Sequence, residues 1–156
     1  MAKKFETVGL GGTFDLLHSG HHALLLKAFD VGKYVLVGVT SDEYVNASRK
    51  PHEIVPYSVR VAALTQFLES NGFSKRYEII PLHDAYGITL SDRKLDAIVV
   101  SKETEPVAHK INNKRKSAGL PPLEIVSVRM VLSEDYHPIS STRIWFEEID
   151  REGNLL

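Results

Sequence analysis

The sequence predicts an α/β fold: a five-stranded parallel sheet with helices on both faces. Two observations carry this prediction. Short apolar runs alternate with helical patterns along the chain, and the strongest run, Tyr34–Thr40, is apolar at nearly every position. Such alternation is typical of α/β proteins, and nearly continuous apolar strands are typical of parallel sheets covered on both faces. A chain of 156 residues is long enough to bury one core and is most simply one domain, so we expect a single domain over residues 1–156.

The expected strands share a high content of β-branched and apolar residues and are bounded by turn signals. Thr7 and Val8 favour the first strand, which is expected to end at the turn pair Gly11-Gly12. The expected strands are Phe5–Leu10, Tyr34–Thr40, Tyr77–Leu82, Asp96–Val100 and Leu123–Val128. Right-handed crossovers place their carboxyl ends at one edge of the sheet, where ligands of such sheets bind.

Helices are expected where packing residues recur at helical spacing between capping or terminating residues. The caps and stops are Ser41-Asp42 and Ser140 at helix starts, and Gly32, Asn71-Gly72 and Gly119 at helix ends. The expected helices are His21–Val31, Asp42–Ala47, Tyr57–Leu68, Thr104–Ala118 and Ser140–Ile149.

Charge and composition exclude several classes of function. With 19 Lys+Arg and 20 Asp+Glu, the formal net charge is −1, which argues against a general nucleic-acid or membrane-surface binder. The absence of cysteine excludes disulfides, thiolate metal sites and a cysteine nucleophile. No apolar run approaches the roughly 20 residues that span a bilayer, and no signal peptide is apparent, so we expect a cytoplasmic protein. Seven histidines remain to be assigned.

A glycine-rich turn and two histidines follow the first expected strand, in the run Gly11–His21 (GGTFDLLHSGH). Glycines let a ligand approach the backbone closely. His18 and His21 stand three residues apart at the start of a helix, which places both imidazoles on one face. We expect exposed helix amides, the helix dipole and the two imidazoles to form a cradle for phosphates, to which Thr13 and Ser19 add hydroxyls.

Other interpretations of this run fit less well. The P-loop and HExxH patterns are absent, and the dinucleotide fingerprint that starts at Gly9 has Phe14 in place of its third glycine. A metal site at His18, His21 and His22 stays open, although no acidic residue lies between them. The histidines could also be ordinary helix-start residues, which would leave the neighbouring glycines unexplained. His22 is expected at the surface or in packing.

A second cluster of hydroxyl groups precedes the last expected helix, where Ser140, Ser141 and Thr142 are followed by Arg143. One interpretation is a simple N-terminal helix cap. The other is a second anion site, because freed helix amides, hydroxyl groups and a guanidinium all favour phosphate.

The run GGTFDLLHSGH resembles the signature of the H-x-G-H nucleotidylyltransferase superfamily, and the ISSTR run at 139–143 resembles its second element. Stretches along nearly the whole chain, above all Pro81–Asp92, are similar to the archaeal and eukaryotic phosphopantetheine adenylyltransferase family. The resemblance implies a Rossmann-like domain that transfers the adenylyl group of ATP to 4′-phosphopantetheine, with release of pyrophosphate. It also implies in-line attack without a covalent intermediate, Mg²⁺ bound with ATP, and no metal ligand from protein side chains.

Residue roles follow from the same resemblance. His18 and His21 are expected to contact ATP phosphates as catalytic residues, together with Lys50. The other expected ATP contacts are Gly11, Gly12, Phe14, Ser140, Ser141, Thr142 and Arg143. The expected contacts to the acceptor are Thr13, Arg49, Lys50 and Lys102. Lys50 is favoured over Arg49 at the reacting phosphates, and the alternative is that both are solvated loop charges.

Some positions depart from the family pattern. Bacterial members use an arginine pair after the fourth strand, where this chain has Ser101–Thr104, so Lys102 or a basic helix segment is expected to substitute. That segment comprises Lys110, Lys114, Arg115 and Lys116, and its alternative role is a solvated helix face. Trp145 replaces a basic residue and is expected to pack. His83, beside Asp84, is the best placed of the other histidines.

Two other functions stay open beside adenylyl transfer to 4′-phosphopantetheine. The first is a cytidylyl- or flavin-type transferase of the same superfamily. The second is a nucleotide-binding module that keeps the fold and performs no chemistry. The intact histidine pair and the 140–143 cluster argue against the second alternative.

Overall fold

The computed structural model describes residues 3–47, 53–84, 86–87, 94–134 and 137–156, and its centre is an all-parallel sheet. The strands run in the spatial order β3-β2-β1-β4-β5. Their bounds are β1 (Phe5–Gly12), β2 (Gly32–Thr40), β3 (Tyr77–Leu82), β4 (Ala97–Ser101) and β5 (Glu124–Val128). The helices are α1 (Ser19–Val31), α2 (Asp42–Ala47), α3 (Tyr57–Ser70), α4 (Glu105–Ser117) and α5 (Ser141–Trp145). The predicted five-stranded parallel sheet is confirmed.

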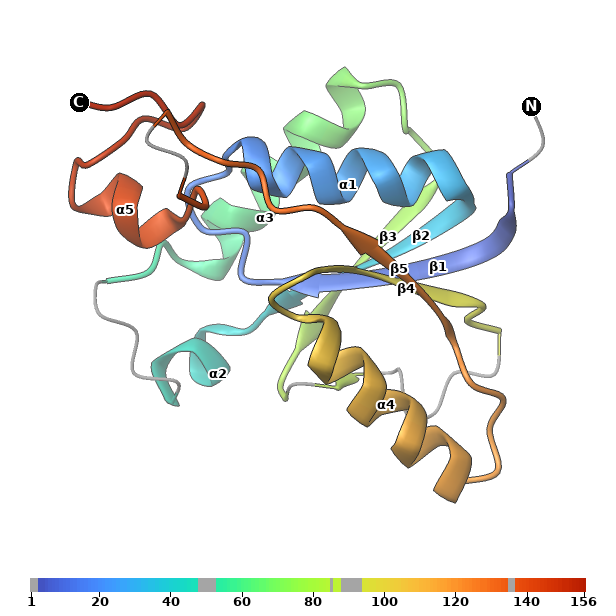
Figure 1. Ribbon diagram of the computed structural model, residues 1–156. Coiled ribbons are helices and arrows are strands. Elements are labelled where there is room, and N and C mark those ends of the chain that lie inside the picture. Colours follow the sequence, from blue (N-terminus) through green and yellow to red (C-terminus); the bar gives the residue numbers. More distant parts are fainter. Residues whose placement is uncertain (1–2, 48–52, 85, 88–93, 135–136) are drawn as a thin grey trace.

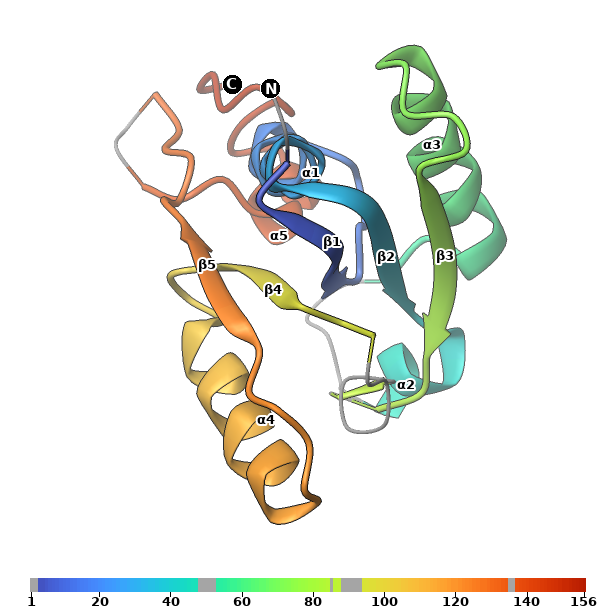
Figure 2. The same cartoon turned by 90° about the vertical axis from the view of Figure 1, so that its right-hand side faces the viewer.

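Helices cover both faces of this sheet (Figure 1), as the continuous apolar strands predict. In β2, Val35, Val37 and Val39 join the cluster of α1 and α3, whereas Leu36 packs with the cluster of α4. The strands β4 and β5 alternate in the same way, because successive side chains of a strand point to opposite faces. Figure 2, seen along the sheet, shows α1 and α3 on one face and α4 on the other.

The strand order places a switch point between β1 and β4. From β1 the chain continues to β2 and β3 on one side, and it then crosses over to β4 and β5 on the other. In open parallel sheets, ligands bind beyond the carboxyl ends of the strands at such a point. Here those ends are Gly12 of β1 and Ser101 of β4.

The first strand is longer than predicted. Gly11 and Gly12 were expected to form the turn, but they are the last residues of β1 and pair with Gly38 and Val39 of β2. The turn follows them instead, where Phe14 (φ 53°) and Leu16 (φ 47°) adopt the left-handed conformation without being glycine. Non-glycine residues in this conformation are uncommon and cluster at functional sites, so this turn is the first place to search for one.

Helix ends follow capping chemistry, but the predicted end of the last helix is wrong. Gly72 (φ 78°) and Gly119 (φ 77°) terminate α3 and α4 as predicted. The last helix was predicted to run to Ile149, but α5 ends at Trp145. Glu147 adopts φ 59°, and the amides of Glu147 and Glu148 donate back to the carbonyls of Ile144 and Arg143, which closes a Schellman motif. A glutamate at this position gives no sequence signal for a stop.

Gly32 has a different role from the one predicted. It is extended (φ −116°) and begins β2 directly after α1 instead of forming a left-handed cap. A Cβ at this position would lie 2.7 Å from Cγ2 of Val8, so close packing of α1 against β1 explains the glycine. Within the described parts of the chain, no helix has the length and apolar character needed to cross a membrane.

Candidate active site

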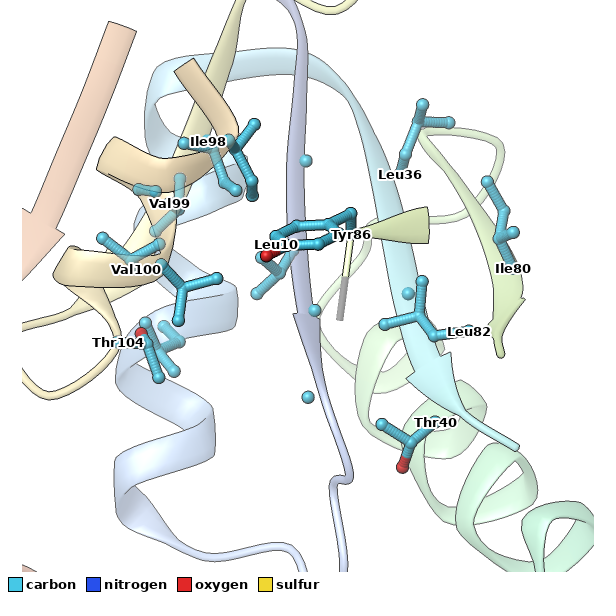
Figure 3. A pocket seen from close by; sticks show the side chains of 18 of the residues that line it. Leu10, Leu36, Thr40, Ile80, Leu82, Tyr86, Ile98, Val99, Val100 and Thr104 are labelled. Atoms are coloured by element: carbon cyan, nitrogen blue, oxygen red, sulfur yellow. The ribbon is translucent and has the colours of Figure 1, made fainter. Parts of the chain in front are cut away.

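Two cavities open at the carboxyl edge of the sheet and share part of their walls. The first has a volume of about 380 Å³, lies over the α4 face of β1, β2 and β4, and is mostly apolar. Figure 3 shows the ring of Tyr86 above β1, between side chains of β4 on one side and side chains of β2 and β3 on the other. We call it the apolar cavity. Lys114 of α4 places its ammonium 5.2 Å from the centre of the Tyr86 ring.

Glycines create the room for the apolar cavity. Gly9 and Gly11 of β1 and Gly38 of β2 all line it, whereas Val8, the residue before Gly9 in β1, packs on the opposite face. A Cβ at Gly11 or Gly38 would lie 3.0 Å or 2.8 Å from the Leu82 side chain. Alternating glycines on one face of two neighbouring strands therefore leave the sheet hollow there, a signal that was present in the sequence and was missed.

The second cavity has a volume of about 410 Å³ and lies between the start of α1, the loop after β4 and the segment that enters α5. We call it the polar cavity. It is lined by Thr13, Asp15, His18, Gly20, His21, Leu24, Ile54, Ser101, Glu103, Thr104, Val128, Arg129, Met130, Val131, Ile139, Ser140, Ser141 and Thr142. Four residues line both cavities: His21, Leu24, Ser101 and Thr104. His21 therefore stands where the two cavities meet.

The two histidines cap α1 with their own side chains. His18 is the N-cap residue, and its Nδ1 accepts a hydrogen bond from the Gly20 amide at 3.0 Å. In return, Nδ1 of His21 accepts from the His18 amide at 3.3 Å. The rings stack with their centres 3.8 Å apart. A Cβ at Gly20 would lie 2.8 Å from Cε1 of His18, so the glycine makes room for the capping imidazole.

This capping fixes the tautomer of both imidazoles. A ring nitrogen that accepts a hydrogen bond carries no proton, so each neutral ring carries its proton on Nε2 and can donate from there. Burial, together with the charges of His22 and Arg151, lowers the pKa of His18 to about 4. Burial, followed by the proximity of His18 and His22, holds the pKa of His21 well below 6.5. Both side chains are therefore neutral Nε2–H donors at pH 7.

One part of the predicted phosphate cradle is wrong: the first amides of α1 are not exposed. The Ser19 amide donates to the carbonyl of Arg151 at 3.0 Å, and its hydroxyl donates to the same oxygen. The amides of Gly20 and His21 are capped by the His18 side chain. Because these donors are already satisfied, the imidazoles, and not the helix backbone, are left to bind an anion.

The turn between β1 and α1 is tied to the second sequence element. The hydroxyl of Ser141 donates to the carbonyl of Asp15. The Asp15 side chain is only 2% exposed and accepts from the Val55 amide at 3.2 Å, while no residue that the structure describes forms a hydrogen bond with its Oδ2. Phe14 was predicted to line the nucleotide cleft with its backbone; its side chain is 2% exposed and lies in the core below the turn, with its ring 5.3 Å from that of His21.

The second element combines the two roles proposed for it. Ser140 caps α5 and accepts from the Arg143 amide at 3.2 Å, as a simple cap would. Ser140, Ser141 and Thr142 also line the polar cavity. Arg143 does not line it: Nη1 donates to the Ser133 hydroxyl at 2.8 Å, and Nε lies 3.5 Å from a carboxylate oxygen of Glu148. In this structure Arg143 braces the element.

The basic side chains predicted to contact the acceptor phosphate do not line either cavity where the structure describes them. Arg49 and Lys50 lie outside the described residues. Lys102 is exposed and lines neither cavity, although its neighbours Ser101 and Glu103 line the polar one. The suggestion that Arg115 substitutes at the acceptor phosphate is wrong, because this side chain is fully buried and donates from Nε to the Pro121 carbonyl at 2.8 Å.

Four further side chains complete the description of the site. Arg129, which follows β5, lines the polar cavity and was missed because nothing in its sequence surroundings marks it. Asp84 lines the apolar cavity and accepts from the amides of Tyr86 and Gly87, which lowers the pKa of its carboxyl group. His83 is exposed and lines neither cavity. His22 packs its ring on Phe67, as a packing residue would.

This chain is similar to a known protein family along most of its length. The sequence model of the cytidylyltransferase-like family matches residues 10–145. The phosphopantetheine adenylyltransferase of Methanopyrus kandleri is 49% identical over 141 residues, which cover 90% of this chain and 89% of the relative. That of Methanothermobacter thermautotrophicus is 46% identical over 156 residues, which cover 100% of this chain and 93% of the relative.

Solved structures share the fold. A protein of unknown function from Archaeoglobus fulgidus superposes with a TM-score of 0.70 at 34% identity, covering 80% of this chain and 89% of that chain. A lipopolysaccharide core biosynthesis protein from Thermoplasma volcanium superposes with a TM-score of 0.62 at 22% identity, covering 79% and 95%, respectively. The second similarity supports the fold alone.

Proposed function

Because this chain belongs to the phosphopantetheine adenylyltransferase family of cytidylyltransferase-like proteins, we propose that it transfers the adenylyl group of ATP to 4′-phosphopantetheine. The products are dephospho-coenzyme A and pyrophosphate, as in a step of coenzyme A synthesis. One observation of the structure carries the proposal: two cavities of opposite character meet at His21. A reaction between two phosphate-bearing substrates, one polar and one with a long uncharged arm, needs such an arrangement.

The chemistry of the walls supports one substrate in each cavity. The nucleotide occupies the polar cavity, where the hydroxyls of Ser140 and Thr142 face its phosphates and Arg129 adds a positive charge, while Ser141 ties the cavity wall to the turn after β1. The pantetheine arm occupies the apolar cavity beside Tyr86, with its phosphate toward Thr13 and His21. Both phosphates then lie at the junction, the arrangement that an in-line displacement requires.

The reaction needs positioning and charge stabilisation and no strong base. A phosphate oxygen of the acceptor attacks the α-phosphorus of ATP, the bond from that phosphorus to the β-phosphate oxygen breaks, and pyrophosphate leaves with the electron pair. The nucleophile is already an anion, so no proton has to be removed before attack. His18 and His21 donate hydrogen bonds from Nε2 to the oxygens on which charge develops, and their neutral state spares the cost of burying two cations.

Magnesium is expected with ATP, bound by the phosphate oxygens. Within the described residues, no group of three or more histidine, aspartate or glutamate side chains is arranged to hold a metal ion. In the polar cavity the carboxylates are those of Asp15 and Glu103. The ion would offset the charge of the leaving pyrophosphate when ATP is bound.

Product analysis with matched substrates tests the proposal. The protein is incubated with ATP and 4′-phosphopantetheine, with CTP and glycerol 3-phosphate, and with ATP and flavin mononucleotide, while pyrophosphate is followed. We expect pyrophosphate and dephospho-coenzyme A in equal amounts from the first pair, and background rates from the other two. Faster release with either other pair would assign a different transferase, and no release from any pair would leave a nucleotide-binding module.

A further inference from the structure

A fully buried arginine lies behind the turn that follows β1. Arg60 belongs to the first turns of α3, and 1% of its surface is exposed. Its guanidinium donates to the carbonyls of Val55 at 2.7 Å, Thr13 at 2.9 Å and Thr40 at 2.8 Å. It also forms an ion pair with Asp42, at 3.0 Å from Nη2 to Oδ1. One side chain therefore joins the phosphate turn, the end of β2, the start of α2 and the segment before α3.

The hydrogen bonds around Arg60 have a fixed direction. A guanidinium can only donate, so the Thr40 hydroxyl accepts where Nη1 approaches it at 3.4 Å, beside the stronger bond to the Thr40 carbonyl. The Thr40 hydroxyl then donates its own proton to Oγ1 of Thr13 at 3.2 Å. With this lone pair occupied, the Thr13 hydroxyl keeps its proton for a partner, and none of the described residues accepts it.

We propose that Arg60 and Thr40 are positioning residues that make the Thr13 hydroxyl a hydrogen-bond donor toward the acceptor phosphate. The inference rests on the proposed function, since Thr13 lines the polar cavity, into which the acceptor phosphate is proposed to reach beside His21. Phosphate oxygens only accept hydrogen bonds, so a hydroxyl that is free to rotate would spend part of its time presenting a lone pair to them. The hydrogen bonds from Arg60 through Thr40 to Thr13 prevent that orientation. Removing them is therefore expected to change the kinetics with the acceptor and not those with ATP.

The Thr40 hydroxyl is the link that can be removed with least disturbance. Thr40→Val keeps the shape of the side chain and the carbonyl bond to Arg60, but it loses the donor to Thr13. We expect kcat/KM for 4′-phosphopantetheine to fall about 3- to 10-fold, the effect of one hydrogen bond, with KM for ATP unchanged. Thr40→Ser keeps the hydroxyl and is expected to restore the wild-type value.

A double-mutant cycle separates the relay from independent effects. In a Thr13→Val background the relay has no end point, so Thr40→Val is expected to cause no further loss. Arg60→Lys should raise KM for the acceptor as well, at temperatures where the variant is folded. Arg76→Lys is the matched control, because Arg76 also donates to backbone carbonyls, those of Phe29, Gly32 and Lys33, but at the opposite end of the sheet.

Each outcome has one meaning. Equal losses from Thr40→Val in the wild-type and Thr13→Val backgrounds, or a Thr40→Ser variant as impaired as Thr40→Val, would overturn the relay while wild-type turnover upholds the proposed function. No turnover by the wild type with ATP and 4′-phosphopantetheine would overturn the proposed function and this inference with it.

Discussion

At the scale of single residues, the histidine pair has a more specific role than its spacing indicates. The sequence places His18 and His21 at a helix start, and the structure confirms that place. The sequence could not show which nitrogen of each ring faces the helix, because this depends on the side-chain rotamers and on the room above Gly20. The prediction that the first amides of α1 are exposed was wrong for the same reason. The His18 imidazole was expected to bind an anion together with these amides, but it accepts hydrogen bonds from two of them instead.

The neutral histidines should make the fold sensitive to mild acid. His18 has a pKa of about 4 when folded, against about 6.5 in an unfolded chain, so the unfolded state takes up the proton first as pH falls. The free energy of unfolding should therefore decrease from pH 6.5 downward, by roughly 1–2 kcal/mol at pH 5 for this residue. Denaturant unfolding at several pH values measures the decrease.

His18→Asn tests the assignment of this acid sensitivity to His18. Asparagine can cap the helix as well as the imidazole does, but it does not titrate over this range. The variant should match the wild type at pH 7.5 and lose less stability at pH 5. His109→Asn, on the exposed side of α4, is the control. Parallel curves for the wild type and His18→Asn would show that His18 is not buried in its neutral form.

At the scale of elements, the strands were more predictable than the segments that make the site. All five predicted strands start and end within two residues of the observed ones, because buried parallel strands are apolar throughout. The last helix was predicted too long, since a left-handed glutamate stops it. The conformation of the turn after β1 could not be predicted either. Phe14 and Leu16 adopt positive φ through tertiary packing, which no local sequence preference encodes.

Filling the hollow in β2 should weaken binding of the acceptor selectively. A Cβ at Gly38 would lie 2.8 Å from the end of the Leu82 side chain, so Gly38→Ala should push Leu82 and narrow the apolar cavity. We expect KM for 4′-phosphopantetheine to rise about 5-fold, for a loss of ~1 kcal/mol, with KM for ATP nearly unchanged.

Gly72→Ala provides the comparison for that change. Gly72 (φ 78°) ends α3 away from both cavities, so alanine there strains the backbone and should lower stability by about 1 kcal/mol without changing either KM. If Gly38→Ala raised both KM values equally, or neither, the assignment of the pantetheine arm to the apolar cavity would be wrong.

At the scale of the whole molecule, the strand order creates the site. The switch point between β1 and β4 lets α4 cover one side of the sheet while α1 and the segment into α5 enclose the other. The sequence could predict that ligands bind at this edge, and its two motifs both line the polar cavity. It could not predict that they touch through Ser141 and Asp15, or that Arg60 braces the turn, because these contacts join positions far apart in the chain.

The stereochemistry of transfer tests the central claim most directly, namely that the acceptor phosphate and ATP meet at His21 and react in one displacement. ATP carrying sulfur in place of one α-phosphate oxygen, as a single diastereomer, is converted with 4′-phosphopantetheine, and the configuration at phosphorus in the product is determined. Direct in-line attack predicts a dephospho-coenzyme A analogue with inverted configuration. Retention would require two displacements through an adenylylated group of the protein, for instance one of the two imidazoles, and would contradict the account.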